Sequence, residues 1–241
     1  MIYINCFDVS EVTIEQYDKC YRMASEERRK RADRYQTLEH SKICIFSEVL
    51  LRYSFFQIYG NSIELHIECN TYGKPYIKNA EDFFFNISHS GKWIVIAFGS
   101  HEVGVDIEQI RWNSSLEKVA SMCCTKEERE YIFCDTKESD IAKRFTKLEI
   151  LKVNIHQKVL KECYMKFLGK GFSTGFLSFS VDGKNETVKD DLGEQIIIKS
   201  NMLGNDYILS VCSKEESASI NKITMETIGE FVDVNISMDK K

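Results

Sequence analysis

The sequence predicts an α+β fold in two halves, and three observations indicate it. Segments whose apolar residues recur at helical spacing are mixed with short segments in which apolar and polar residues alternate. Helices followed by strands occur on both sides of Ser100, although no sequence repeat is visible. The 241 residues are 43% hydrophobic, enough for one large core or two smaller ones. We expect an N-terminal half at 1–100 and a C-terminal half at 101–241.

The first half opens with alternating residues at 1–7, which indicate a strand. Two helices are expected at 13–35 and 41–59; the first becomes strongly basic at 28–31, and the second has an apolar face. The remaining elements are a turn at 70–75 and strands at 63–68, 83–87 and 93–98.

The second half begins with a strand at 103–107. Helices are expected at 115–133 and 141–168, and Gly169 and Gly171 end the second. Alternation then predicts four more strands, at 176–181, 195–199, 207–212 and 223–232.

The composition excludes several classes of protein. A net charge of −5 argues against general nucleic-acid binding, and no apolar stretch approaches the ~20 residues of a membrane span. The nine cysteines lack paired C-x-x-C spacing, which disfavours a zinc site. Because the first residues also lack the features of a secretory signal, we expect a cytoplasmic protein with reduced cysteines.

Two carboxylates stand two residues apart in the stretch GVDIE. On a strand, Val105 and Ile107 face one side, while Asp106 and Glu108 share the other. Like charges on one face repel unless a cation lies between them, and Mg²⁺ suits one or two carboxylates together with substrate phosphates. The alternative is the solvated outer face of an edge strand.

Three further groups each allow two interpretations. In SHSG, His89 can donate to a phosphate oxygen and the turn can bind an anion, or the stretch is a plain hairpin connection. Glu162 and Lys166 are i,i+4 neighbours: either a surface ion pair, or a third carboxylate with a phosphate-binding lysine. The basic run 28–31 and Lys74 are either phosphate contacts or solvated surface.

The order of these motifs resembles the 4′-phosphopantetheinyl transferase family. The motifs are YGKPY, FNISHSGKW, GVDIE and, from Lys161, KECYMKFLGKG. The resemblance runs from about Glu26 to about Glu215, and it is to the type that activates surfactin-like nonribosomal peptide synthetases of antibiotic biosynthesis. It implies a monomeric pseudo-dimer of two α+β halves, with coenzyme A and Mg²⁺ at their junction.

The resemblance also implies an activity and its residues. The enzyme would move the 4′-phosphopantetheine arm of coenzyme A to a serine of an apo peptidyl or acyl carrier protein, releasing adenosine 3′,5′-bisphosphate. The implied metal ligands are Asp106, Glu108 and Glu162. The implied coenzyme A contacts are Gly73, Lys74 and Pro75 beside the adenine, Ser88, His89 and Lys166 at the phosphates, and the region 28–31 at the 3′-phosphate.

The catalytic group that takes the proton of the carrier serine stays open in the sequence. Glu162 can accept it directly or through a metal-bound water, and Glu128 in CTKEE is a second candidate. Mg²⁺, His89 and Lys166 would neutralise the charge that grows on the pyrophosphate.

The chain departs from the family pattern near the start of the second helix. The family has an arginine where this chain reads SKICIFSE. Counting back from Glu48 puts Ile43 at that place, and counting forward from Tyr35 puts Lys42 there. We expect Lys42 to make the phosphate contact, as a point charge rather than a bidentate fork.

A second departure concerns the family motif W-x-x-K-E-x-x-x-K. The chain has two partial copies nine residues apart, which makes 149–157 an insertion and puts Lys158 in the place of the tryptophan. We expect the part from Lys158 onward to keep the active-site register, with the insertion lengthening the helix at its N-terminal side or bulging out. The alternative function is a coenzyme A-binding paralogue with impaired catalysis.

Overall fold

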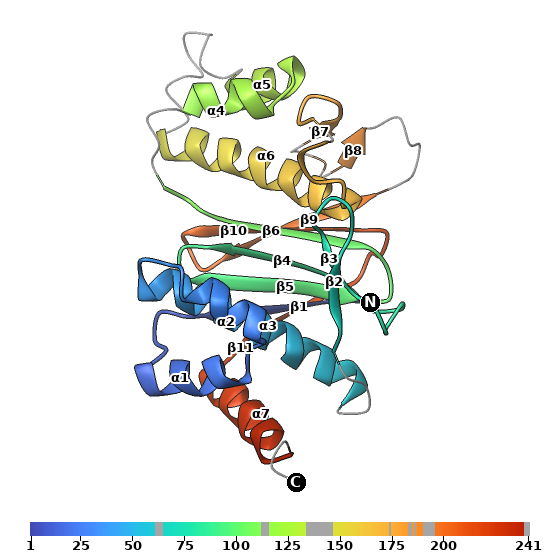
Figure 1. Cartoon of the computed structure of the whole chain (residues 1–241). Helices are drawn as coiled ribbons and strands as arrows, with labels where there is room; N and C mark the ends of the chain where they lie inside the picture. The colour runs from blue at the N-terminus through green and yellow to red at the C-terminus, as the bar shows by residue number, and fades with distance from the viewer. Residues whose placement is uncertain are drawn as a thin grey trace.

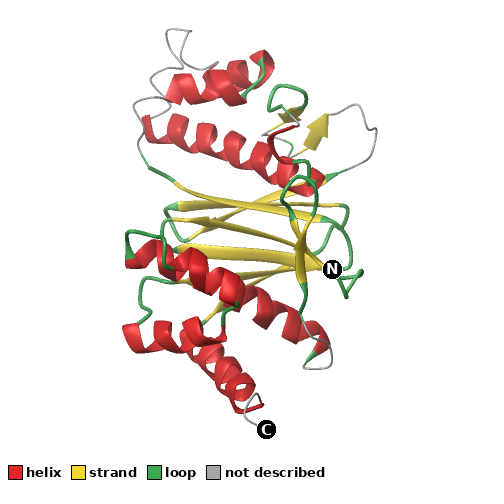
Figure 2. Cartoon of the chain, in the orientation of Figure 1, coloured by secondary structure: helices red, strands yellow, loops and turns green. Residues whose placement is uncertain are grey.

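The computed structural model has the α+β fold that the sequence predicts, and it describes residues 1–60, 65–111, 116–133, 147–173, 175–182, 185, 187–189 and 196–238. Two β-sheets lie between two groups of helices (Figure 1). Figure 2 shows the same arrangement by secondary structure, with the strands in the middle of the molecule. None of the described helices is both long and apolar enough to span a membrane.

The elements that precede residue 100 open with one strand and three helices. They are β1 (Ile2–Asp8), α1 (Ile14–Met23), α2 (Glu26–Ala32), α3 (Leu38–Tyr59), β2 (Ile67–Cys69), β3 (Pro75–Ile77), β4 (Phe84–Ser90) and β5 (Trp93–Gly99).

The elements after residue 100 begin in the same order. They are β6 (Val103–Gln109), α4 (Leu116–Cys123), α5 (Lys126–Phe133), α6 (Lys147–Leu168), the short 3₁₀ helix η2 (Gly171–Ser173), β7 (Ser180–Asp182), β8 (Thr187–Lys189), β9 (Ile197–Leu203) and β10 (Tyr207–Ser213). The chain ends with β11 (Ala218–Ile223) and α7 (Met225–Met238).

The strands form two larger sheets and one small hairpin. The first sheet has the order β11-β1-β5-β4, the second has the order β6-β10-β9-β8-β7, and β2 pairs with β3. β11 runs parallel to β1, while β5 is antiparallel to both β1 and β4. Residues 218–223 therefore return to the sheet of the first half, although the sequence-based division placed them in the second.

A hydrophobic core lies between the two sheets. Alternate residues of one strand from each sheet illustrate it: Ile2, Ile4 and Cys6 of β1, and Val103, Val105 and Ile107 of β6. Alternate residues of β5 and β10 complete this core. On the outer faces, α3 and α7 cover the first sheet and α6 covers the second, each through its own buried cluster. The site element α6 thus packs on the outer face of the sheet to which β6 belongs, while the apolar residues of β6 point to the inner core.

The helix predicted over 13–35 is two helices in the structure. Ala24 is extended, with φ −67° and ψ 151°, and this ends α1. Ser25 then caps α2, because its hydroxyl accepts a hydrogen bond from the backbone N–H of Arg28. Ser25 is a capping signal that the prediction of one helix over 13–35 did not use.

The strand predicted over 223–232 is wrong beyond Ile223. Thr224 stops β11 and accepts the backbone N–H of Thr227, and a helix follows. Ile228, Phe231 and Val232 are buried at helical spacing against α3. Alternation indicated a strand there, but the packing of these residues against a helix decides the outcome.

Gly104 allows α6 to lie unusually close to β6. A Cβ atom at this position would stand 2.2 Å from the carbonyl oxygen of Cys163 and 2.6 Å from the backbone nitrogen of Phe167. The thiol of Cys163 donates back to the carbonyl oxygens of Gly104 and Ser210, each at 3.3 Å. Only glycine fits here, so this residue fixes the distance between the helix and the sheet.

We expect Gly104→Ala to destabilise the protein by about 1–3 kcal/mol or more, because the added methyl group meets backbone atoms that cannot rotate away. Urea unfolding followed by circular dichroism measures the change. The matched control is Gly229→Ala in α7, where a Cβ atom meets nothing within 4 Å. This control should be neutral or stabilising by about 0.5–1 kcal/mol. Equal stability of the two variants would show that α6 can move away from β6 without cost.

Candidate functional site

The two faces of β6 separate as the alternation predicts. Val105 and Ile107 enter the core between the sheets. Asp106 and Glu108 lie on the other face and both receive lysines from α6. The sequence prediction that these two carboxylates share one face is confirmed, and the alternative of a solvated outer face does not hold because α6 covers it.

Asp106 is a buried carboxylate with one satisfied and one unsatisfied oxygen. It is 3% exposed. Its Oδ1 accepts from Ser88 Oγ at 2.8 Å and from Lys166 Nζ at 2.5 Å. Its Oδ2 is buried and has no hydrogen-bond partner among the residues that the structure describes. A buried anionic oxygen without a donor is unfavourable, so this atom is where a cation would be bound.

Glu108 and Glu162 share a second lysine. Lys158 Nζ lies 2.5 Å from Glu108 Oε1 and 3.4 Å from Glu162 Oε1. Ser90 Oγ donates to the other oxygen of Glu108 at 2.9 Å. Burial lowers the pKa of Lys158, but the hydrogen bond to Glu108 and the nearby carboxylates outweigh it, so its pKa is raised. Burial, followed by the charge of Asp106, raises the pKa of Glu162 above that of an ordinary glutamate.

The lysines and Glu162 come from one face of a single helix. Lys158, Glu162 and Lys166 are four residues apart on α6 and therefore lie above one another along it. Residues 149–157 continue the same helix toward its N-terminus and do not bulge out. The predicted lengthening of the helix is what the structure has, while residues 141–146 of the predicted helix lie outside the described residues.

β4 joins β6 through side chains rather than through a backbone ladder. Asn86 Oδ1 accepts the backbone N–H of Val105 at 3.0 Å. Ser88 and Ser90 donate to Asp106 and Glu108 respectively. Gly91, the last residue of SHSG, forms the turn together with Lys92, and its φ of 55° is what the hairpin interpretation requires. Ser88 and His89 lie on the strand itself.

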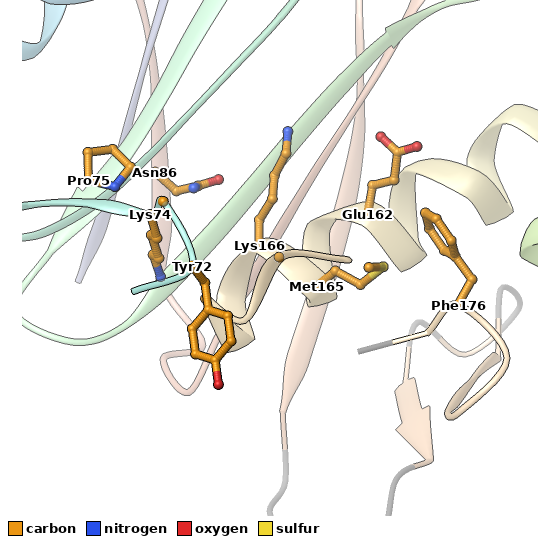
Figure 3. Close-up of a pocket in the computed structure, with 11 residues that line it drawn as sticks. Tyr72, Lys74, Pro75, Asn86, Glu162, Met165, Lys166 and Phe176 are labelled. Atoms are coloured by element: carbon orange, nitrogen blue, oxygen red, sulfur yellow. The ribbon is translucent and has the colours of Figure 1, made fainter. Parts of the chain in front are cut away.

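A cavity of about 270 Å³ opens beside Glu162 and Lys166 (Figure 3). Its side chains come from the β2–β3 hairpin, from β4, and from α6 and the segment after it. It is lined by Tyr72, Gly73, Lys74, Pro75, Asn86, Glu162, Met165, Lys166, Gly169, Gly171 and Phe176. Apart from the two charged side chains of α6, its wall includes the apolar surfaces of Met165 and Phe176.

A larger cavity of about 620 Å³ shares Gly73 and Pro75 with the first. It lies between α2, α3, the β2–β3 hairpin and β4. Its basic lining residues are Arg28, Arg31, His40, Arg52 and His89. Desolvation, and then the positive charges of Lys166 and Arg31, lower the pKa of His89, so this imidazole is neutral at pH 7.

Glu48 organises two of the arginines in this cavity. It is 1% exposed, and its oxygens accept from Arg52 Nε at 2.9 Å and from the backbone and hydroxyl of Ser25. Arg28 Nε lies 3.4 Å from the same carboxylate. Burial raises the pKa of Glu48, but Arg52 and the Ser25 hydrogen bonds outweigh it and hold the pKa below the ordinary value.

Lys42 does not line this cavity. Its ammonium donates to the carbonyl oxygen of Val12 at 2.5 Å, and Ile43 lines the cavity instead. Neighbouring residues on a helix point about 100° apart, so Lys42 and Ile43 cannot both face the cavity. The one that faces it is the apolar Ile43. The expected phosphate contact of Lys42 is therefore not part of the arrangement.

Lys74 is present at the smaller cavity, but its ammonium is already engaged. It lies 2.6 Å from Glu102 Oε2 and donates to the carbonyl oxygen of Phe167 at 3.3 Å. Asn70 Nδ2 similarly donates to the carbonyl oxygen of Gly169 at 3.0 Å. These contacts fasten the turn at 70–74 to the C-terminal end of α6, which satisfies carbonyl groups that the helix leaves free.

Glu128 is held in a buried ion pair away from both cavities. Its two oxygens receive Lys161 Nζ at 3.0 and 2.8 Å, and the backbone N–H of Val181 at 2.7 Å. Lys161 is 0% exposed and Glu128 is 3% exposed. The pair joins α5, α6 and β7, which is a structural arrangement rather than that of a base open to substrate.

The residues around Asp106 suit a magnesium ion held by few protein ligands. Among the described residues, no three His, Cys, Asp or Glu side chains converge as a complete metal cage. Mg²⁺ does not need one, because it is held by one or two carboxylates with substrate phosphates and waters. The unpartnered Oδ2 of Asp106 and the hard oxygens of Glu108 and Glu162 fit that requirement.

Sequence reasoning missed several residues of the site. Asn86 and Ser90 repeat the period-2 spacing of Ser88, so the alternation N-x-S-x-S on a strand was an available signal. Lys158 was recognised only as a missing tryptophan. The arginine-binding role of Glu48 had no signal in the sequence, since it depends on how α2 packs on α3.

Comparison with known proteins gives consistent matches. Residues 11–101 match a family model described as 4′-phosphopantetheinyl transferase, N-terminal. The chain is 31% identical to the 4′-phosphopantetheinyl transferase gsp of Aneurinibacillus migulanus, over 86% of this chain and 83% of that protein. It is 29% identical to the 4′-phosphopantetheinyl transferase Sfp of Bacillus subtilis (strain 168), over 83% and 86%, and 28% identical to psf-1 of Bacillus pumilus, over 85% of each.

We expect Lys161→Met to lower the free energy of unfolding by about 3–5 kcal/mol, because it leaves the Glu128 carboxylate buried without its counter-ion. Chemical denaturation measures this. The double variant Lys161→Met with Glu128→Gln removes the orphaned charge and should recover part of the loss. A cost below about 1 kcal/mol for the single variant would contradict the structural role of the pair.

Proposed function

Since the chain belongs to the 4′-phosphopantetheinyl transferase family, we propose that it transfers the 4′-phosphopantetheine arm of coenzyme A to a serine of an apo peptidyl or acyl carrier protein, releasing adenosine 3′,5′-bisphosphate. The observation that carries the proposal is the junction of β6 and α6. There, the three carboxylates and Lys166 meet beside two connected cavities. We further propose that the carrier belongs to a nonribosomal peptide synthetase.

The two cavities support a single path for coenzyme A. The larger one carries three arginines beside its glutamates, two of them held by Glu48, and suits the nucleotide with its 3′-phosphate near Arg28, Arg31 and His40. The smaller one has apolar walls and suits the pantetheine arm. Gly73 and Pro75 line both, so the pyrophosphate would pass between them, beside Lys166 and His89. A neutral His89 can donate one hydrogen bond to a phosphate oxygen.

We propose Mg²⁺ as the cofactor, with Asp106 as its main ligand and Glu108 and Glu162 as further oxygen donors. The support is the buried, unpartnered Oδ2 of Asp106 together with the hard oxygens around it. When bound, the ion supplies positive charge that offsets the charge growing on the pyrophosphate. Ser88 holds Asp106 in place by its hydrogen bond, and so acts as a positioning residue rather than a phosphate contact.

Glu162 is the residue we propose as proton acceptor. The oxygen of the carrier serine forms a bond to the phosphorus that carries the pantetheine arm, and the bond from that phosphorus to the bridging oxygen breaks. The hydroxyl proton passes to Glu162, whose raised pKa makes its carboxylate more basic than an ordinary one. Lys166 faces the leaving phosphate. Glu128 is not assigned this role because Lys161 and Val181 occupy both of its oxygens.

We also propose that the chain is a pseudo-dimer with its division near Ser100. Among the described elements, the order strand, three helices, four strands occurs once in β1–β5 and again in β6–β10. The strand orders β1-β5-β4 and β6-β10-β9 correspond as well, and α3 and α6 each have 22 residues. Because each half already packs against the other through its sheet, we propose a monomer, acting in the cytoplasm without nucleic acid or membrane as a partner.

The second candidate function is a coenzyme A-binding paralogue that does not transfer. Lys158 is the observation that favours it, since its ammonium lies between two of the carboxylates proposed for the metal. One assay distinguishes the two. The protein is incubated with coenzyme A, Mg²⁺ and an apo peptidyl carrier protein, and the carrier mass is read. A gain of one phosphopantetheine supports the transferase, and binding of coenzyme A without that gain supports the paralogue.

We expect Asp106→Asn to reduce the rate of transfer by at least about 100-fold, because the substitution removes the charge that holds the cation but keeps the shape of the side chain. The mass assay measures the rate, and circular dichroism should show an unchanged fold. Asp18→Asn, an exposed acid-to-amide change on α1, is the matched control and should leave the rate unchanged. Transfer at the wild-type rate by Asp106→Asn would refute the assignment.

A further inference from the structure

Lys158 places a positive charge inside the acidic site. Its ammonium lies 2.5 Å from Glu108 Oε1 and 3.4 Å from Glu162 Oε1, and the three side chains are only 26–30% exposed. Lys166 in turn contacts Asp106 at 2.5 Å. The site thus combines three carboxylates with two ammonium groups, so its net charge is one negative unit rather than three.

The ammonium of Lys158 and a divalent cation need the same oxygens. Glu108 Oε1 points to Lys158, and its other oxygen receives Ser90. A cation bound to Glu108 and Glu162 would stand within a few ångströms of the ammonium. A divalent cation and an ammonium group this close repel each other, and the repulsion is stronger in a half-buried site than in bulk water. Both cannot occupy the space between these two carboxylates.

We propose that Lys158 is an intramolecular competitor for the divalent cation, which closes the site between Glu108 and Glu162 until the cation displaces it. The competition lowers the affinity for the metal in the absence of coenzyme A. It does not act on Asp106 Oδ2, a buried oxygen that has no donor among the described residues. The inference rests on the proposed metal site, but it concerns binding and not transfer.

The test measures Mn²⁺ binding to the full chain without coenzyme A, by electron paramagnetic resonance of the free ion. Lys158→Met keeps an unbranched side chain of similar length and removes the charge. We expect this variant to bind Mn²⁺ about tenfold or more tightly than the wild type, because one repelling charge is lost. Lys152→Met removes the same charge from an exposed position on the same helix and should change the affinity by less than about twofold.

The melting temperature is a second readout, which distinguishes a change in Mn²⁺ affinity from a failure of the variant to fold. Without its ammonium, the Lys158→Met site holds like charges close together, so its melting temperature should fall in metal-free buffer and rise more with Mn²⁺ than that of the wild type. Lys158→Gln should behave in the same direction. Mn²⁺ affinity equal to or weaker than that of the wild type in both Lys158 variants would overturn the inference. The proposed function would still stand if the wild-type protein transfers phosphopantetheine in the mass assay. If neither the wild type nor any variant binds Mn²⁺, the metal site itself fails, and the inference fails with it.

Discussion

The close contact of α6 with β6 at Gly104 is the constraint on which the site depends. Because no side chain stands between them, backbone atoms of Cys163 and Phe167 lie directly over the strand. Lys158 then reaches Glu108, and Lys166 reaches Asp106, at ion-pair distance, while Glu162 lies 3.4 Å from Lys158 on the same helix. A spacer of one methyl group would move these charges apart. The glycine of GVDIE therefore belongs to the site as much as its two acids do.

A second junction completes the site from the other sheet. Asn86, Ser88 and Ser90 of β4 make side-chain hydrogen bonds to β6, where a ladder of backbone hydrogen bonds would otherwise be expected between neighbouring strands. Side-chain hydrogen bonds hold the two sheets together and at the same time orient the two carboxylates. One set of polar residues thus serves both architecture and chemistry. Asp106 Oδ1 and both oxygens of Glu108 have donors among the described residues, while the buried Asp106 Oδ2 has none there, which points to that atom as the place for a cation.

The sequence was informative where a periodic pattern and the final packing agree. Alternation was enough to place Asp106 and Glu108 on one face, and it correctly indicated the α+β class and most strands. It failed at Met225–Met238, where β-branched residues fill a helix because α3 offers them an apolar surface. It could not choose between Lys42 and Ile43, since one residue of register on a helix turns a side chain by about 100°. Nor could it show that Lys158 enters the acidic site, which is a property of α6 packed on β6.

The measurement that tests the central claim most directly is an anomalous difference map at the manganese edge, from crystals grown with coenzyme A and Mn²⁺. We expect one peak within coordination distance of Asp106 Oδ2, between β6 and α6, with the pyrophosphate of coenzyme A beside Lys166. We also expect Lys158 to be displaced from Glu108 in that crystal. A peak elsewhere, or coenzyme A bound with no metal at Asp106, would contradict the claim that the contact of α6 with β6 builds the catalytic site.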